Sequence, residues 1–291
     1  MPQPRLMLVV TGDDFGYCPR RNRGIVECFL AGGVSSVSLL VNAAAAKEAA
    51  HLAKRHKIPI GLHANLSEGS PVCGSLQKVS TLLNPRGFFH GKMGFRLALE
   101  RGQLDMKQVE LELRAQVQQF VELTGHLPHH MDGHQHVHVL PEVREVFAHV
   151  LSDLRILYTR VPVEPGLQSC PWLPAELQRF YSQVGKDALD SVPVFKHYGI
   201  RLQRALELGL GAGPGEAPRG GGAGPGGPVA TAELMVHPGY PSQPGEGGCG
   251  EGPDQFSQSA DRQHEMGVLS DPALLDFYRQ HSVQLCGFRD L

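Results

Sequence analysis

The sequence lacks a marked excess of charge of either sign and lacks a long apolar run. Its 27 Lys and Arg against 29 Asp and Glu leave a net charge of −2, so bulk charge selects neither nucleic acid nor an anionic membrane as a partner. The N-terminal apolar run, at 6–10, has only five residues. A secretory signal needs a longer core, and a spanning helix needs about 20 apolar residues. We therefore expect neither nucleic acid nor a membrane as a partner.

The sequence also lacks a CxxC spacing, because its six cysteines are scattered. In a chain of 291 residues such cysteines are typical of reduced thiols in a cytosolic or nuclear protein. We expect a cytoplasmic location, with a nuclear one as the alternative. No pattern in the chain predicts an oligomeric state.

Short apolar runs alternate with helical patterns along the chain. The predicted strands are 5–12, 34–42, 58–66, 155–163, 231–239 and 282–288, and the predicted helices are 20–31, 43–56 and 105–125. The stretch 129–138 is predicted as a short strand and loop, with Pro141 at the first position of the next helix. This alternation is typical of the α/β class with a mainly parallel sheet, either open or closed into a barrel.

Two segments are dominated by Gly and Pro. Residues 211–228 contain nine Gly and four Pro in eighteen positions, and 243–255 is similar. Neither has enough apolar surface to offset the entropy of ordering it, so we expect mobile insertions. The first separates strands that belong together, and we therefore predict one domain over 1–291 rather than two domains and a linker.

Four polar clusters follow predicted strands: "TGDDFG" (11–16), "GLHANLSEG" (61–69), "HMDGHQHVH" (130–138) and "VHPGY" (236–240). In parallel α/β folds the carboxyl ends of the strands share one rim, where ligands and active sites collect. Each cluster is weak evidence alone. Their coincidence on one rim predicts an active site.

Histidine is concentrated in the third cluster, since five of the fifteen histidines lie within 129–138. Asp132 and His134 are two residues apart, as are His134, His136 and His138, so an extended strand would direct each pair to one face. Imidazoles and carboxylates are the usual source of metal ligands, although a solvated His-rich loop is the alternative. Spacing alone does not select the ligand, and surplus imidazoles could orient ligands or meet substrate.

The other clusters are ambiguous one by one. Asp13 and Asp14 could provide a metal ligand and a base, or one could cap a helix while the other is solvated. A lone His63 after a strand is more often hydrogen-bonded than metal-bound. Pro238 restricts His237 to an extended geometry that could point the imidazole into a cavity, as a general acid or as a strand-end filler.

In this order, the clusters resemble the YdjC-like carbohydrate deacetylase family, which includes chitooligosaccharide deacetylases. The matching elements, from residue 7 to 291, are "TGDDFG", "GLHANLSEGSPV", "HMDGHQHVH", "TRVP", "ELMVHPGY" and the terminal "GFRDL". The resemblance implies an irregular (β/α) barrel. It also implies a divalent metal, generally Mg²⁺, bound by Asp14, His63 and His134.

The resemblance further implies Asp13 as the proton acceptor, His237 as the general acid and Arg160 in the lining of the pocket. Among the surplus imidazoles, we expect His136 and His138 to contact the substrate. Bacterial relatives often carry His where this chain has Gln at position 135, so substrate contacts are expected to differ.

The predicted reaction is the hydrolysis of an N-acetyl group on a carbohydrate such as a chito-oligosaccharide, releasing acetate. Imidazole ligands favour Zn²⁺, Mn²⁺ or Co²⁺ over Mg²⁺, which prefers oxygen, so the metal remains open. One alternative is a metal-dependent hydrolase of phosphoesters or cyclic amides, although no Gly-rich phosphate nest lies in the clusters. The other is a metal-binding protein that acts through partners bound by its Gly- and Pro-rich segments.

Overall fold

The structure is a computed structural model that describes residues 6–164, 166–167, 170–171, 173–207 and 229–291. The predicted insertion at 211–228 lies outside the described residues. No helix within the described part of the chain is long and apolar enough to cross a membrane.

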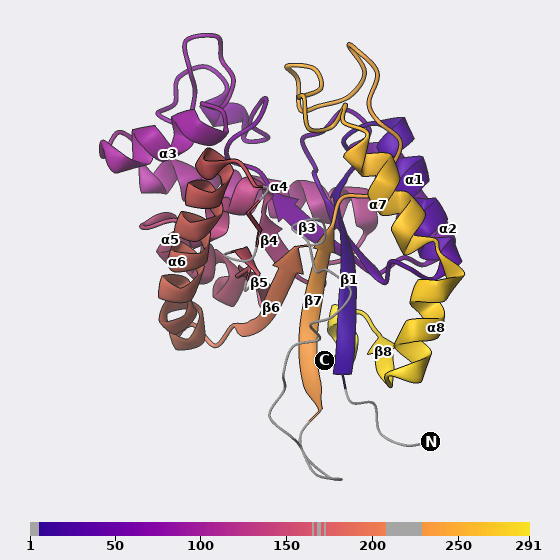
Figure 1. The fold of residues 1–291 in the computed structure, drawn as a ribbon. Coiled ribbons are helices and arrows are strands. Elements are labelled where there is room, and N and C mark those ends of the chain that lie inside the picture. Colours follow the sequence, from indigo (N-terminus) through magenta and orange to yellow (C-terminus); the bar gives the residue numbers. More distant parts are fainter. Residues whose placement is uncertain (1–5, 165, 168–169, 172, 208–228) are drawn as a thin grey trace.

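A single parallel sheet forms the centre of the molecule (Figure 1). Its strands are β1 (Leu6–Phe15), β2 (Ser36–Leu39), β3 (Ile60–Ala64), β4 (Met131–Gly133), β5 (Tyr158–Pro162), β6 (Arg201–Glu207), β7 (Ala230–Val236) and β8 (Val283–Leu285). They pair in the order β4-β3-β2-β1-β7-β6-β5. The edge of β1 opposite β7 is shared, because β8 pairs Leu6–Leu8 and β2 pairs the part from Thr11 onward. The predicted parallel α/β class is confirmed.

The two ends of this strand order approach each other. The hydroxyl of Thr159 on β5 donates a hydrogen bond of 2.7 Å to the carbonyl of Met131 on β4. The described residues show no backbone ladder between these two strands. The sheet therefore curls into an irregular barrel that side-chain contacts close, among them an ion pair of 2.9 Å between Arg160 on β5 and Asp132 on β4.

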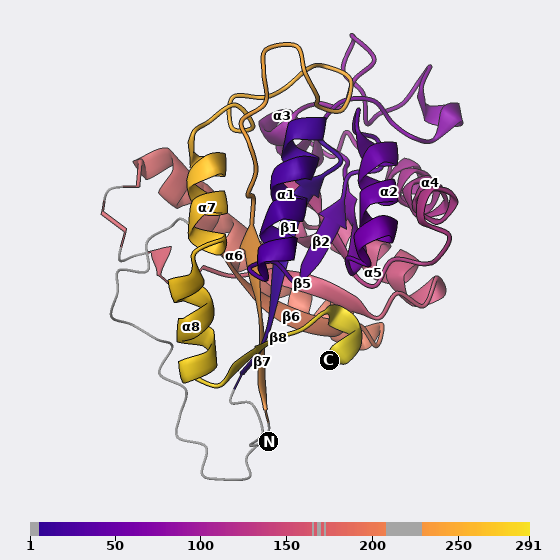
Figure 2. The ribbon, with the colours of Figure 1, turned by 90° about the vertical axis from the view of Figure 1, so that its right-hand side faces the viewer.

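Helices cover the outside of the sheet (Figures 1 and 2). They are α1 (Pro19–Ala31), α2 (Ala46–His56), α3 (Lys92–Glu100), α4 (Met106–Thr124), α5 (Val143–Asp153), α6 (Ala175–His197), α7 (Asp261–Leu269) and α8 (Pro272–Gln280). Neighbours pack in the order α7, α1, α2, α4, α5, α6 around the sheet. Helix α4 ends where predicted, because Gly125 adopts the left-handed φ of 84° that favours glycine.

Three local predictions differ from the structure. The helix expected to open at Pro141 begins at Val143, because Glu142 has a left-handed φ of 62°. Helix α3, which lies before the predicted helix 105–125, was not predicted. Helix α6 was not predicted, and Pro193 in its interior explains why, since a proline inside a helical pattern indicates a break.

The second Gly-rich segment, 243–255, lies along the open end of the barrel. Its Cys249 side chain is 2% exposed and packs against Tyr17, Leu40 and Ala43. The Cys249 carbonyl also accepts a 2.9 Å hydrogen bond from the Ser70 amide. The mobility of this segment stays a prediction, but its middle is anchored to the body of the protein.

Candidate metal centre

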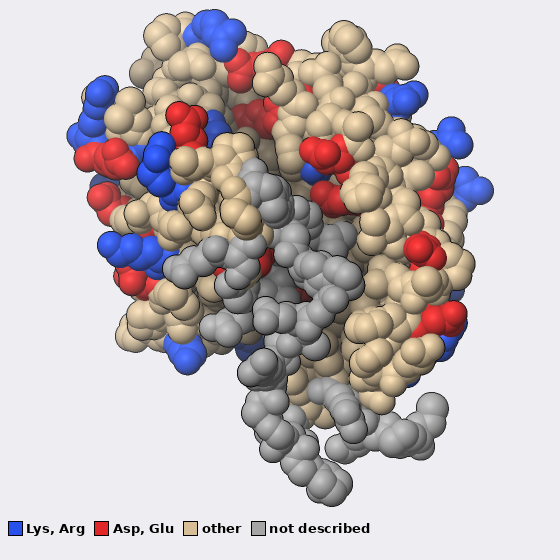
Figure 3. All heavy atoms as spheres, in the orientation of Figure 1, with Lys and Arg blue, Asp and Glu red and all other residues tan. Residues whose placement is uncertain are grey.

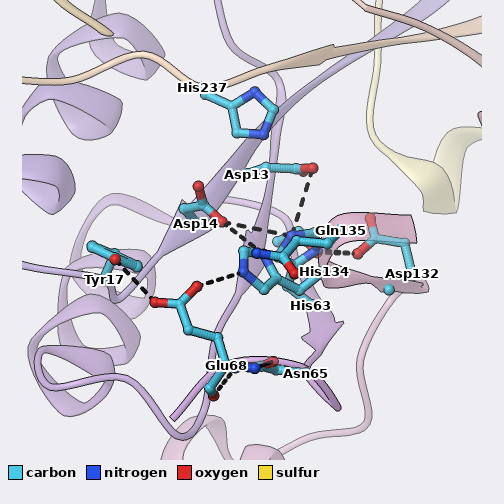
Figure 4. A network of polar contacts seen from close by, with 12 residues as sticks. Asp13, Asp14, Tyr17, His63, Asn65, Glu68, Asp132, His134, Gln135 and His237 are labelled. Atoms are coloured by element: carbon cyan, nitrogen blue, oxygen red, sulfur yellow. Dashed lines mark hydrogen bonds and ion pairs between the residues drawn. The ribbon is translucent and has the colours of Figure 1, made fainter. Parts of the chain in front are cut away.

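The four polar clusters meet at the carboxyl ends of the strands, as predicted. Asp13 and Asp14 lie near the end of β1, His63 near the end of β3, and His237 directly after β7 (Figure 4). The register between β1 and β2 shifts between Gly12 and Phe15, and Asp14 has a φ of 60°. This irregularity lets two adjacent carboxylates reach the same region.

Asp14, His63 and His134 form a group that could hold a metal ion. Asp14 Oδ1 lies 3.7 Å from His63 Nε2 and 3.2 Å from His134 Nδ1. None of the three residues is more than 7% exposed. Asp14 Oδ1 is buried and makes no well-aligned hydrogen bond to any described residue. A buried carboxylate oxygen facing two ring nitrogens suits a bound cation.

Each of these imidazoles is oriented by a second carboxylate. His63 Nδ1 lies 2.5 Å from Asp132 Oδ1, and His134 Nε2 lies 2.9 Å from Glu68 Oε2. The other nitrogen of each ring therefore faces Asp14. Carboxylates behind metal-binding histidines are common, because they fix the ring and raise its basicity.

His134 sits on a tight turn rather than on a strand. After β4, residues His134–Val139 form a 3-10 turn in which Gln135 and His136 have left-handed φ values of 53° and 60°. The prediction that residues two apart would share one face is therefore wrong. Arg96 donates to the Gln135 carbonyl at 3.0 Å and Ser67 to the Gln135 side-chain oxygen at 2.9 Å, so both hold this turn in place.

The turn sends the later imidazoles in other directions. His138 is 0% exposed, and its ring lies beside Phe147 and Phe195. Its Nδ1 accepts a 3.1 Å hydrogen bond from the Gly133 amide, and its Nε2 donates to the Arg160 carbonyl at 3.0 Å. Both ring nitrogens are thus engaged inside the protein. His136 is also buried, but its Nδ1 has no partner among the described residues.

Arg160, expected in the lining of the pocket, is fully buried behind Asp13. Its guanidinium binds the Asp13 carboxylate through both oxygens, at 2.5 and 2.8 Å. It also contacts Glu233 at 2.8 Å and Asp132 at 2.9 Å. The structure therefore places Arg160 where it holds carboxylates rather than where it meets solvent.

The centre has an excess of negative charge. The Arg160 guanidinium contacts three carboxylates, those of Asp13, Asp132 and Glu233, and His134 contacts the other two, those of Asp14 and Glu68. Figure 3 shows the surface hollowed at this end of the molecule, with acidic side chains at the hollow. Buried carboxylates that outnumber the cations beside them favour a bound counter-ion.

The two adjacent aspartates ionise differently. Although burial opposes it, the imidazoles of His134, His237 and His63 hold the pKa of Asp14 well below its ordinary value. Burial raises the pKa of Asp13, although Arg160 and His63 oppose the rise. Asp14 is therefore poised as a permanent anion, and Asp13 as a carboxylate that accepts a proton more readily.

The histidines also differ. Burial lowers the pKa of His134, but its contacts with Asp14 and Glu68 outweigh this and raise the pKa to about 10. Burial and the nearby Arg262 hold the pKa of His237 well below its ordinary value. His237 is anchored through its backbone, because its amide donates to Glu265 at 2.6 Å and its carbonyl accepts from Arg21 at 2.9 Å.

Sequence reasoning did not identify Glu68 or Glu233 as site residues, and it named Asp132 only as a member of the His-rich cluster. Glu68 and Asp132 lie inside "GLHANLSEG" and "HMDGHQHVH", so motif membership was the available signal. Glu233 is the first residue of "ELMVHPGY", and that motif was its signal, because on β7 it alternates with apolar residues like any strand residue.

The chain matches the family model described as YdjC-like protein over residues 7–280. The chain belongs to the YdjC-like family. It is 61% identical to a carbohydrate deacetylase of Danio rerio over 100% of both chains. It is 52% identical to one of Homo sapiens, over 100% of this chain and 93% of the relative, and 31% identical to one of Geobacillus stearothermophilus, over 97% and 96%.

The fold is also similar to that of a crystal structure from Enterococcus faecalis, described there as a candidate cellobiose-phosphate cleavage protein. The two structures superpose with a TM-score of 0.62 at 17% identity, over 100% of this chain and 99% of the other. At this identity the similarity concerns the fold. The family resemblance read from the motifs is confirmed.

Proposed function

We propose that the protein is a metal-dependent hydrolase that removes N-acetyl groups from acetylated carbohydrates of the chito-oligosaccharide type, releasing acetate. The observation that carries this proposal is the buried group of Asp14, His63 and His134 with Asp13 beside it. Relatives described as carbohydrate deacetylases align with the chain over its whole length, which supports the same reaction class.

Asp14, His63 and His134 would hold a divalent ion. Their fit is supported by Asp14 Oδ1, which is buried and makes no well-aligned hydrogen bond, and by the surplus of carboxylates around Arg160. When bound, such an ion polarises the amide carbonyl and lowers the pKa of the attacking water. The family resemblance favours Mg²⁺, whereas two imidazole ligands favour Zn²⁺, Mn²⁺ or Co²⁺.

Asp13 would accept the proton of the attacking water. Its carboxylate lies 3.8 Å from His63 Nε2, next to the proposed ion site, and Arg160 holds both of its oxygens. Its raised pKa brings it closer to the operating pH, which improves a general base. Such a base contributes about 10²- to 10⁴-fold to rate.

His237 would return a proton to the departing amine. Its ring lies over Asp13 and Asp14 (Figure 4). Because its pKa is held low, His237 enters the reaction neutral and acts as an acid only after gaining a proton. Asp13 takes one proton from water and the leaving nitrogen gains one, so the reaction neither consumes nor releases a proton at these groups.

Among the residues predicted to contact substrate, we retain His136, whose Nδ1 is unpartnered. For Arg160 and His138 we propose positioning roles instead, because both are 0% exposed and their polar atoms face other protein groups. We also propose a cytoplasmic or nuclear location, which the scattered cysteines without a CxxC spacing support.

The experiment is acetate release from N-acetylated chito-oligomers by metal-stripped protein after addition of Mg²⁺, Mn²⁺, Zn²⁺ or Co²⁺. We expect turnover with at least one ion and none without metal. Absence of acetate with all four ions, on a broad panel of acetylated sugars, would refute the proposal.

A further inference from the structure

Tyr17 connects the Gly-rich segment 243–255 to the candidate metal centre. Its side chain is 2% exposed, and its hydroxyl donates to Glu68 Oε1 at 3.0 Å. The same hydroxyl accepts a hydrogen bond of 2.9 Å from the Asp254 amide. Burial and the Glu68 carboxylate raise the pKa of Tyr17 far above its ordinary value, so the hydroxyl keeps its proton.

Glu68 continues the connection to His134. Its second oxygen, Oε2, lies 2.9 Å from His134 Nε2, while Nδ1 on the opposite side of that ring lies 3.2 Å from Asp14 Oδ1 (Figure 4). The backbone of Glu68 is fixed by Asn65, whose side chain accepts from the Glu68 amide at 2.9 Å and donates to its carbonyl at 2.8 Å. The Asp254 amide donates to the Tyr17 hydroxyl, and this hydroxyl in turn donates to Glu68.

The two candidate ligand histidines are therefore oriented from different parts of the protein. Asp132, behind His63, is held in the core by Ser38 at 2.8 Å and by Arg160 at 2.9 Å. Glu68, behind His134, is held by Tyr17 and, through it, by a segment at the rim. Among these described interactions, those that hold His134 include a contact with segment 243–255, and those that hold His63 do not.

We infer that Tyr17 and Glu68 are positioning residues for His134, and that they couple the seating of segment 243–255 to the geometry of the metal ligand. Glu68 keeps the Nε2 proton of His134 engaged, which leaves Nδ1 to face the ion. Tyr17 fixes the Glu68 rotamer and is itself bound to the segment through the hydrogen bond from the Asp254 amide. This inference rests on the metal-binding part of the proposed function.

The test is a Co²⁺ titration of the metal-stripped full chain, followed by absorption spectroscopy, for wild type, Glu68→Gln and Tyr17→Phe. We expect Glu68→Gln to weaken Co²⁺ affinity by about 10- to 100-fold. Tyr17→Phe removes one hydrogen bond and should weaken it by about 3- to 10-fold. Tyr240→Phe is the matched control, because the Tyr240 hydroxyl donates to Glu27 at 2.7 Å away from the metal group, and it should not change the affinity.

A second readout separates positioning from a general loss of structure. In the Co²⁺-loaded protein the His134 Nε2 proton should give a paramagnetically shifted NMR signal that exchanges slowly with water. Tyr17→Phe should accelerate this exchange while the exchange of the His63 Nδ1 proton, bound to Asp132, stays unchanged.

Two results would count against the inference. If wild type binds Co²⁺ and both variants match Tyr240→Phe in affinity and in exchange, Tyr17 and Glu68 have no positioning role and the proposed function stands. If wild type binds neither Co²⁺ nor the other three ions, the metal-binding proposal fails and the inference fails with it. Urea unfolding of each variant shows whether it is folded, and Tyr17→Phe alone decides the matter if Glu68→Gln is unfolded.

Discussion

Arg160 holds Asp13 through both carboxylate oxygens, and neither residue is more than 1% exposed. The strands that carry them, β5 and β1, are not neighbours in the sheet. Glu233 on β7 occupies the Nε side of the same guanidinium at 3.0 Å. The ion pair thus fixes the proposed base from the interior, and its loss affects both stability and catalysis.

Arg160→Met is expected to destabilise the protein by about 3–5 kcal/mol, because it leaves buried carboxylates without a counter-charge. The measurement is the free energy of unfolding in urea. Arg114→Met is the matched control, since Arg114 pairs with Glu110 and Asp153 at the surface and its loss should cost about 0–1 kcal/mol. Equal losses in the two variants would contradict a structural role for the buried pair.

The adjacent aspartates should separate metal binding from catalysis. Asp14→Asn removes the charge of the proposed ligand and should weaken metal binding by more than about 100-fold. This is more than the loss expected for a residue that only hydrogen-bonds a metal ligand. Asp13→Asn should retain the metal and lose about 10²- to 10⁴-fold in deacetylation rate. Metal content and acetate release are measured on both, with the exposed Asp190→Asn as control. Unchanged turnover in Asp13→Asn would show that the base is another group.

Metal binding should release a proton. The pKa of His134, raised to about 10 in the metal-free protein, means that the ring is protonated at neutral pH and that an ion must displace this proton. Affinity should therefore rise with pH, by up to about tenfold per unit, until pH approaches 10. Calorimetry in buffers of different ionisation enthalpy measures the proton count. Binding heats that do not depend on the buffer would contradict the prediction.

Acid should destabilise the fold through His138, whose pKa burial lowers to about 4. Its Nδ1 accepts the Gly133 amide proton, so the folded state holds the neutral ring, whereas the unfolded chain protonates near its ordinary value of about 6.5. The contribution is present above pH 6.5 and is lost as the pH falls towards 4, by up to about 3 kcal/mol.

The measurement is urea unfolding across this pH range for wild type and His138→Gln. The variant should show a shallower fall in stability. Some dependence should remain, because the pKa of His129 is also lowered to about 4 by burial. Parallel curves for the two proteins would show that His138 does not titrate as described.

Local chemistry made much of the architecture predictable. The apolar runs of β1 and β7 and the helical spacing between Asp105 and Gly125 depend on nearest neighbours, and the structure confirms them. The metal-binding residue types could also be recognised from local sequence. Helix α6 was missed because Pro193 argues locally against a helix that long-range packing nonetheless stabilises.

The order of residues shows which chemical groups are present and predicts that the strand ends bring them to one rim. The tertiary structure shows why residue spacing does not select the imidazole that faces Asp14: the left-handed turn at Gln135 overrides the two-residue spacing of an extended strand, and it places His134 there, as the family resemblance implied. The tertiary structure also decided that Arg160 binds Asp13 across 147 positions of the chain and that Glu68 orients His134 across 66. Such contacts arise from strand order and sheet closure, and spacing along the chain carries no information about either.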